Sequence, residues 1–205
     1  MKWPRTWRAP ARSRVALIGM ETRRIAVGDR AWTVRVGGPE SRHTVLLLPD
    51  AGASADVYDQ VCERLHNSDL RTITVESIDG LDKAAVYAIL DDLGVAWANL
   101  AGYGAGAELA WQLGARGFGR FVGLVVAGRA HPAVAVDGTA ADATCPAVEL
   151  PTTVIATEDL PRTVADSCGR HVFGEFRVTQ VDTADVPLKA DHEFATEIVL
   201  RSGLW

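Results

Sequence analysis

The sequence predicts an α/β protein, with a mostly parallel sheet, helices on both faces and an N-terminal antiparallel hairpin. Short continuous apolar runs alternate with segments whose apolar residues recur at helical spacing, which is typical of parallel strands covered by helices. Two runs that alternate apolar and polar residues precede them, as in a hairpin. The 205 residues are 48% hydrophobic and 23% charged, which suffices for one ordinary globular core.

The hairpin is expected between residues 24 and 36, at an edge of the sheet. The runs at 25–27 and 31–36 alternate apolar and polar residues, and Gly28 and Asp29 supply the turn between them.

The remaining elements follow in regular alternation. The apolar runs predict strands at 44–48, 71–75, 97–101, 121–127, 152–156 and 177–181. Helical spacing predicts helices at 55–66, 82–93, 105–115, 161–171 and 193–200. Ser54 is the expected N-cap of the first helix. We expect Trp32, Trp97 and Trp111 to pack in the core.

Residues 128–150 interrupt this alternation with Gly, Pro, Ala and Asp and with no periodicity. We interpret them as a surface excursion in the cap region of a single domain spanning 21–205, with a minimal or absent cap.

Residues 1–20 contain five basic residues and no acidic one, so the net charge of −5 leaves −10 on the remaining 185. The apolar stretch at 15–20 is too short for a secretory signal. Two interpretations stay open: a basic arm that attaches to an anionic partner, or a start at Met20. Three scattered cysteines predict no disulfide framework and fit a reducing cytoplasm.

Several classes of function are disfavoured by composition and spacing. No apolar run approaches the ~18 residues of a membrane span, and the negative net charge argues against nucleic acid as a partner. We expect no metal and no cofactor, because the histidines lack ligand spacing. Cys62, Cys145 and Cys168 have no histidine nearby in sequence and are expected to be inert thiols.

The most informative motif is the small-residue turn from Gly102 to Gly106, between a predicted strand and a predicted helix. In a G-x-S-x-G nucleophile elbow, flanking glycines let the backbone turn sharply and lift a side chain to the edge of the sheet. Gly104 stands at the nucleophile position and has no side chain that could attack a carbonyl. The glycines also fit a tight turn without chemistry. A dinucleotide loop is disfavoured, because the G-x-G-x-x-G spacing is missing.

With this motif, the chain resembles the α/β-hydrolase superfamily over nearly its whole length. The resemblance extends from the hairpin through Pro49, Asp50, Ala51 and Gly52 to the terminal helix. The order of parts agrees: a loop after the first parallel strand, the elbow, an acid after a later strand and a histidine after the last strand.

More narrowly, residues 49–52 and 102–107 resemble motifs of the N-myc-downstream-regulated (Ndr) family, and residues 75–80 correspond to its acidic, glycine-containing loop. Those proteins have a hydrolase fold whose elbow has likewise lost its nucleophile. This chain differs from the family in being shorter, in having only residues 128–150 where a larger cap is usual, and in Pro49.

The superfamily resemblance assigns the acid and histidine positions to Asp159 and His192, as a vestigial or residual pair. Each also has a structural interpretation, Asp159 as a helix cap and His192 as a surface residue at a helix start. Candidate ligand-binding residues line the elbow and the loop after the first parallel strand, whose N–H groups form an oxyanion hole in active relatives. They are Asp50, Ala51, Gly52, Tyr103 and Ala105.

The resulting prediction is a cytoplasmic, non-catalytic α/β-hydrolase-fold protein with a ligand-binding or interaction role. Its partner would be a small molecule or a protein, and a homodimer would be one way to cover an exposed sheet edge. The alternative is an active hydrolase of small esters or thioesters, in which His192 and Asp159 act with water or an unrecognised nucleophile.

Overall fold

The computed structural model describes residues 19–203, which form an eight-stranded sheet in the order β1-β2-β4-β3-β5-β6-β9-β10. β1 and β2 form the predicted antiparallel hairpin at one edge, and β2 also pairs antiparallel with β4. The other pairings in this sheet are parallel. The strands are β1 (Glu21–Val27), β2 (Arg30–Gly37), β3 (Thr44–Leu48), β4 (Arg71–Val75), β5 (Ala98–Tyr103), β6 (Phe121–Ala127), β9 (Thr152–Ala156) and β10 (Phe176–Gln180). A separate small hairpin consists of β7 (Ala135–Val136) and β8 (Thr139–Ala140).

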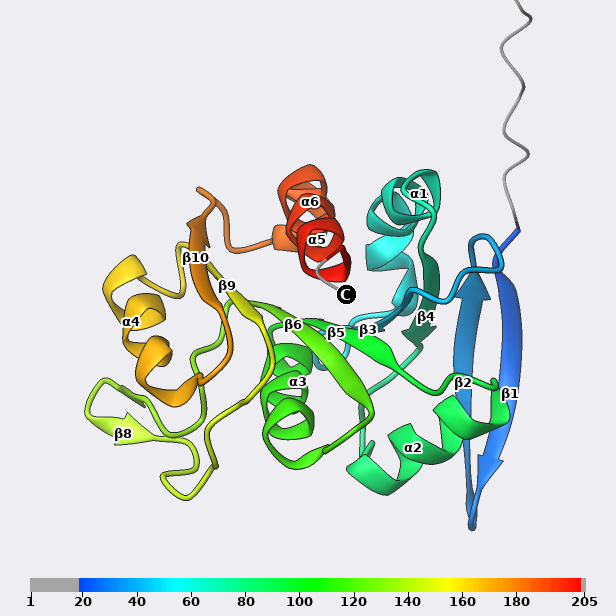
Figure 1. Ribbon diagram of the computed structural model, residues 1–205, viewed down its shortest axis with the longest axis horizontal. Helices are drawn as coiled ribbons and strands as arrows, with labels where there is room; N and C mark the ends of the chain where they lie inside the picture. Colours follow the sequence, from blue (N-terminus) through cyan, green and yellow to red (C-terminus); the bar gives the residue numbers. More distant parts are fainter. Residues whose placement is uncertain (1–18, 204–205) are drawn as a thin grey trace, which may run out of the picture.

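Helices cover both faces of the sheet, as predicted. They are the 3-10 turn η1 (Ala55–Tyr58), α1 (Asp59–Asn67), α2 (Lys83–Asp92), α3 (Ala105–Arg116), α4 (Arg162–Ser167), the 3-10 turn η2 (Cys168–His171), α5 (Val186–Lys189) and α6 (Asp191–Ser202). Figure 1 shows α1, α5 and α6 on one side of the sheet and α2 and α3 on the other. Within residues 19–203, no helix is both long and apolar enough to cross a bilayer.

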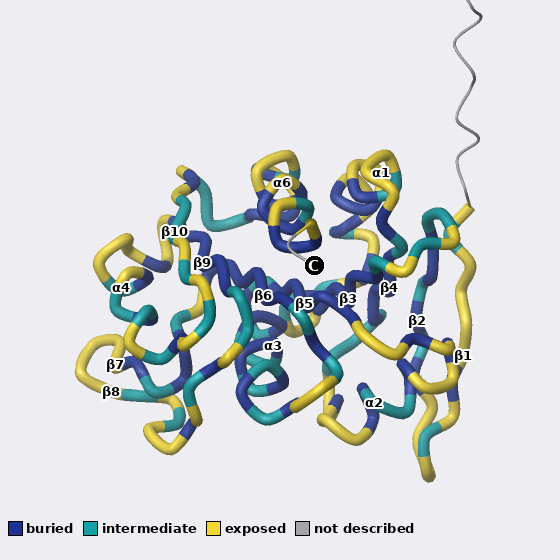
Figure 2. The backbone as a smooth tube through the Cα atoms, viewed as in Figure 1, coloured by how far each residue is buried: buried dark blue, intermediate teal, exposed yellow. Residues whose placement is uncertain are grey.

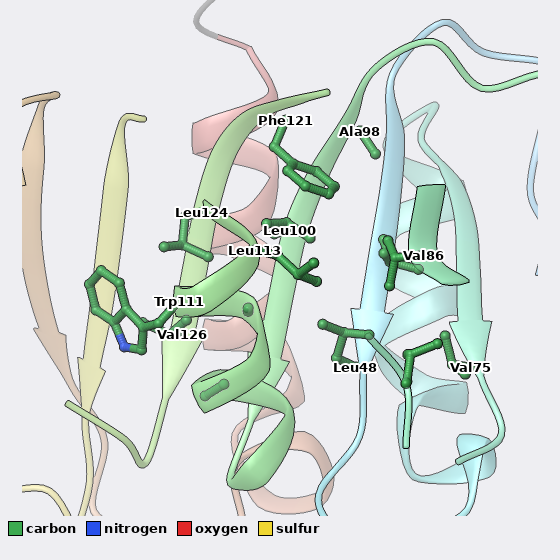
Figure 3. Packing of buried hydrophobic residues seen from close by; sticks show 14 of the residues in the cluster. Leu48, Val75, Val86, Ala98, Leu100, Trp111, Leu113, Phe121, Leu124 and Val126 are labelled. Atoms are coloured by element: carbon green, nitrogen blue, oxygen red, sulfur yellow. The ribbon is translucent and has the colours of Figure 1, made fainter. Parts of the chain in front are cut away.

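Two hydrophobic cores result, one on each face. β3 and β9 are buried along their whole length, which explains why they are continuous apolar runs rather than alternating ones. Figure 2 shows this burial along the central strands. On the α2 and α3 side, Leu100, Leu113 and Leu124 pack together with Trp111 (Figure 3).

Several predicted boundaries differ from the structure. β5 begins one residue later than predicted and continues to Tyr103, so the strand runs directly into the elbow. The helix predicted at 161–171 is divided into α4 and η2, and the short helix α5 was not predicted. Residues 128–150 contain the small hairpin β7–β8 that their composition did not indicate.

Two side-chain predictions differ from the structure. Ser54 stands at the predicted N-cap position, before η1, but its side chain makes no capping hydrogen bond; its hydroxyl donates to Glu76 across a loop at 3.4 Å. Trp97 is 53% exposed, whereas Trp32 and Trp111 are buried as expected. Trp97 lies just before β5, outside the strand, where the regular alternation of the sheet does not fix the direction of its side chain. The predicted basic arm lies outside the described residues except for Gly19 and Met20.

Candidate functional site

The elbow joins β5 to α3 at Gly104. Its backbone has φ 58° and ψ −128°, a conformation that glycine adopts without the strain that a side chain would bring. The Gly104 N–H donates to the Ala127 carbonyl at 3.2 Å, and the Gly104 carbonyl accepts from the Ala107 N–H at 3.0 Å. The sharp strand-to-helix turn of a nucleophile elbow is therefore present, with glycine at its apex.

Gly102 and Gly106 allow backbone segments to approach too closely for any side chain. A Cβ on Gly102 would lie 2.4 Å from the Gly106 carbonyl oxygen, and a Cβ on Gly106 would lie 2.1 Å from that of Leu48. The elbow thus packs backbone against backbone on the end of β3. This contact fixes the loop after β3 beside the first residues of α3.

The carboxylate of Asp50, in that loop, occupies the space that a side chain at position 104 would need. A Cβ on Gly104 would lie 2.3 Å from Asp50 Cγ. Asp50 Oδ1 accepts hydrogen bonds from the Ala105 N–H at 2.7 Å and from the Ala51 N–H at 2.8 Å. In an elbow hydrolase, an oxyanion hole is formed by the N–H that follows the nucleophile and by an N–H from the loop after β3. The corresponding groups are present in this chain, and the protein's own carboxylate fills the space between them.

Acidic side chains surround Tyr103, which precedes the apex of the elbow. Burial, and then the negative charges of Asp50, Asp185 and Asp159, raise the pKa of the Tyr103 hydroxyl. The three carboxylates come from the loops after β3, β10 and β9. They act on the same hydroxyl because the carboxyl ends of parallel strands lie at one edge of a sheet. Arg129 opposes their effect on the Tyr103 pKa, so negative charge predominates around this hydroxyl.

A cavity of about 290 Å³ lies beside the elbow. Gly128 and Arg129 after β6, Asp159 after β9 and Glu108 in the first turn of α3 line it, and the 128–150 excursion forms its outer wall. Within residues 19–203, the side chains of Glu108 and Asp159 make no hydrogen bond or ion pair, whereas Arg129 donates to the Gly128 carbonyl at 2.9 Å. The cavity therefore offers two carboxylates that remain available to a ligand.

His192 lies exposed on the first turn of α6, not in the loop that directly follows β10. Across the described chain, no hydrogen bond or ion pair joins it to Asp159. The loop after β10 contains Asp182 and Asp185 instead. Asp159 does not cap α4, because Pro161 holds the N-cap position, so the capping interpretation is wrong. Catalysis by the Asp159–His192 pair stays a prediction.

The predicted ligand-binding residues separate into two groups. Asp50, Ala51, Tyr103 and Ala105 meet at the elbow, as described above. Gly52 lies beyond them in an exposed turn with φ 74°, where an added Cβ would meet nothing within 4 Å. Its positive φ shapes the loop.

Three charged residues at this edge were missed by sequence reasoning, namely Glu108, Arg129 and Asp185. Arg129 and Asp185 follow strands of the parallel sheet, and Glu108 stands in the first turn after the elbow. Their place just after a strand, or just after the elbow, could have identified them as site residues. The sequence prediction used this criterion only for Asp50, Asp159 and His192.

The three cysteines are buried, as expected of inert thiols. Burial raises the pKa of each, that of Cys168 to about 11, so the reactive thiolate is disfavoured. No cluster of three or more metal-ligating side chains is found among the residues that the structure describes.

Solved structures share this architecture. A hydrolase from Pseudomonas aeruginosa PA01 aligns with a TM-score of 0.73 at 13% identity, over 89% of this chain and 98% of its own. The enol-lactonase from Burkholderia xenovorans LB400 aligns with a TM-score of 0.73 at 13% identity, over 87% and 99%. Epoxide hydrolases of the α/β-hydrolase superfamily from hot-environment metagenomes align with a TM-score of 0.69 at 13% identity, over 89% and 99%.

The chain therefore has the α/β-hydrolase fold that the elbow and the order of parts along the sequence predicted. The identities are low, so the likeness concerns the fold alone. No protein-family model matches the sequence, and no curated protein sequence matches it.

Proposed function

We propose that this α/β-hydrolase-fold protein binds a small molecule at the elbow edge and does not carry out acyl transfer. The observation that carries the proposal is the Asp50 carboxylate in the oxyanion hole, beside a glycine at the elbow apex. Gly104 supplies no nucleophile. Both N–H groups that would stabilise an oxyanion already donate to Asp50 Oδ1.

The charge at this position also opposes acyl transfer. An oxyanion hole accelerates the reaction by donating hydrogen bonds to negative charge that develops on the substrate oxygen. Asp50 places a carboxylate in that position, and a second negative charge beside it would be repelled. A substrate carbonyl would therefore gain no stabilisation unless Asp50 moved away.

The cavity beside the elbow is the proposed ligand site. It lies at the carboxyl ends of the parallel strands, where open α/β sheets bind their ligands. Glu108 and Asp159 are available there to recognise a ligand. The resemblance to the Ndr family supports a non-catalytic role, because its members have also lost the elbow nucleophile.

Ligand binding is tested with two matched substitutions on the excursion. Ala141 lines the cavity and its neighbour Ala140 does not. Small molecules that raise the melting temperature of the wild type should also stabilise Ala140→Trp and should fail to stabilise Ala141→Trp. Equal stabilisation of both variants would place the ligand elsewhere. If no compound in the library raises the melting temperature of the wild type, a small-molecule role is contradicted.

Catalysis is tested with short acyl esters and thioesters. We expect no turnover by the wild type above the buffer rate. The variant Asp50→Gly/Gly104→Ser removes the carboxylate and supplies a hydroxyl, and turnover gained there would assign the missing chemistry to these two positions. Wild-type turnover that is lost in His192→Ala would overturn the proposal and establish the alternative, a hydrolase in which His192 and Asp159 activate water.

A further inference from the structure

A buried histidine anchors the excursion that forms the outer wall of the cavity. His131 is 1% exposed and lies at the beginning of the excursion. Its ring meets Trp111 of α3 edge-on, at 5.1 Å between centroids. On η2, the ring of His171 stacks on it at 4.7 Å, with the two planes 4° apart. The excursion is thus attached to two helical elements through one imidazole.

Both ring nitrogens of His131 bind the excursion itself. The Ala133 N–H donates to Nδ1 at 3.2 Å, so Nε2 holds the proton and donates to the Pro146 carbonyl at 3.0 Å. The neutral ring therefore joins residues 133 and 146 across the excursion. The His131 backbone N–H also donates to Cys168 Sγ at 3.3 Å.

The segment between these anchors borders two cavities. Ala133 and Val134 line a second cavity of about 400 Å³, on the side of α4 and η2, and Val134 also lines the cavity beside the elbow. The small hairpin β7–β8 continues from this segment, and three of its four residues are exposed. Figure 2 shows it on the outside of the molecule. Val134 and Cys145 are buried in the core beside the ring, so outward movement of the segment would expose them, whereas the hairpin is already largely exposed.

We propose that His131 is a latch, which holds the excursion over the cavity while its ring is neutral and releases it when the ring is protonated. Protonation places a proton on Nδ1, so that it faces the Ala133 N–H donor against donor. It also adds positive charge to a ring stacked on His171.

The charged and titratable groups near His131 do not compensate for this added charge. Arg116 of α3 and His171 of η2 disfavour the charged ring. Arg170, also on η2, disfavours charge on His171 in the same way. Asp142 of the excursion favours the charged ring, but it is paired with Arg116 at 2.8 Å and accepts hydrogen bonds from Thr144.

The nearby thiols, Cys145 and Cys168, carry no charge at neutral or acidic pH because their pKa values are raised. Burial, the largest influence, lowers the pKa of His131 from 6.5 to about 4. Opening the excursion hydrates the ring and returns its pKa toward 6.5, so acid favours the open form. With a pKa of about 4 in the closed form and 6.5 in the open form, the equilibrium constant for opening rises about twenty-fold between pH 7 and pH 5.

The test is hydrogen exchange at pH 7 and pH 5, with each amide corrected for its intrinsic rate. In the wild type, protection of residues 133–145 should fall about twenty-fold, while β5 and β6 stay unchanged. His131→Gln keeps one acceptor and one donor but cannot become charged, so its excursion should show no fall. His192→Gln, at an exposed site on α6, should behave as the wild type.

Equal protection of the wild-type excursion at both pH values would overturn the latch, as would the same fall in His131→Gln. If that variant fails to fold, an NMR titration of His131 in the wild type decides, because a midpoint above about pH 6 would show that the closed excursion does not prefer the neutral ring. The latch rests on the proposed function only for the role of the cavity. Because hydrogen exchange is measured without ligand, failure of the latch is distinguishable from failure of the proposed ligand binding.

Discussion

The elbow lies beside the cavity and the excursion forms its outer wall, and the two are held in place by different interactions. At the elbow, Gly102 and Gly106 bring backbones together so closely that a single added carbon would collide. The excursion is held by a backbone bridge at Val148 and also by side chains, through the ring of His131 and the ion pair between Arg116 and Asp142. The elbow should therefore respond to added volume and the excursion to added charge.

The largest expected effect comes from adding one methyl group to the elbow. Gly106→Ala places its Cβ 2.1 Å from the Leu48 carbonyl oxygen, and neither backbone can yield easily. We expect a loss of about 3 kcal/mol or more in the free energy of unfolding, measured by urea denaturation.

Gly114→Ala, in the same helix, is the matched control. Its Cβ would meet only side chains, the nearest at 3.5 Å, which is ordinary contact. There alanine should stabilise the chain by about 0.5–1 kcal/mol, because it favours the helical backbone more than glycine does. Similar effects of the two substitutions would show that the elbow is not built on close backbone approach.

A smaller effect is expected from the contact between position 104 and Asp50. Gly104→Ala should destabilise the chain, both through its positive φ and through the Asp50 carboxylate 2.3 Å from the new Cβ. Asp50→Gly removes the second cause only. A double-mutant cycle should therefore show a coupling of about 1–2 kcal/mol, with the double variant more stable than the sum predicts. Strict additivity would mean that Asp50 does not occupy the nucleophile's place.

The remaining prediction concerns the acid response of the excursion in global unfolding. The pKa of His131 is lower in the folded chain than in the unfolded one, so the stability that depends on its neutral ring is present above pH 6.5 and is lost as pH falls toward 4. As pH is lowered through this window, the melting temperature should fall in the wild type and should fall less in His131→Gln. Asp142 does not contribute in this window. Hydrogen bonds from Thr144 and Arg116 lower its pKa from 3.8 to about 2 in the folded chain, so the stability that depends on its charged form is lost only at lower pH.

The order of strands and helices could be predicted because each element has its own local signal. β3 and β9 are continuous apolar runs that need burial on both faces, and α3 follows the glycines of the elbow. Errors concentrated where local patterns compete with packing. Trp97 is apolar but stands outside the sheet, and Ser54 has a capping side chain that bonds Glu76 instead.

The sequence alone determined the fold class and the glycine at the apex of the elbow, since strand periodicity and the identity of residue 104 are local facts. Only the tertiary structure decided what fills the site. Asp50 and Ala105 are 55 positions apart, and they meet because β3 and β5 are neighbours whose carboxyl ends share one edge. His131 likewise acquires its buried, stacked place through η2, forty residues away. Parallel strands bring distant loops together, and no local pattern records which side chains then meet.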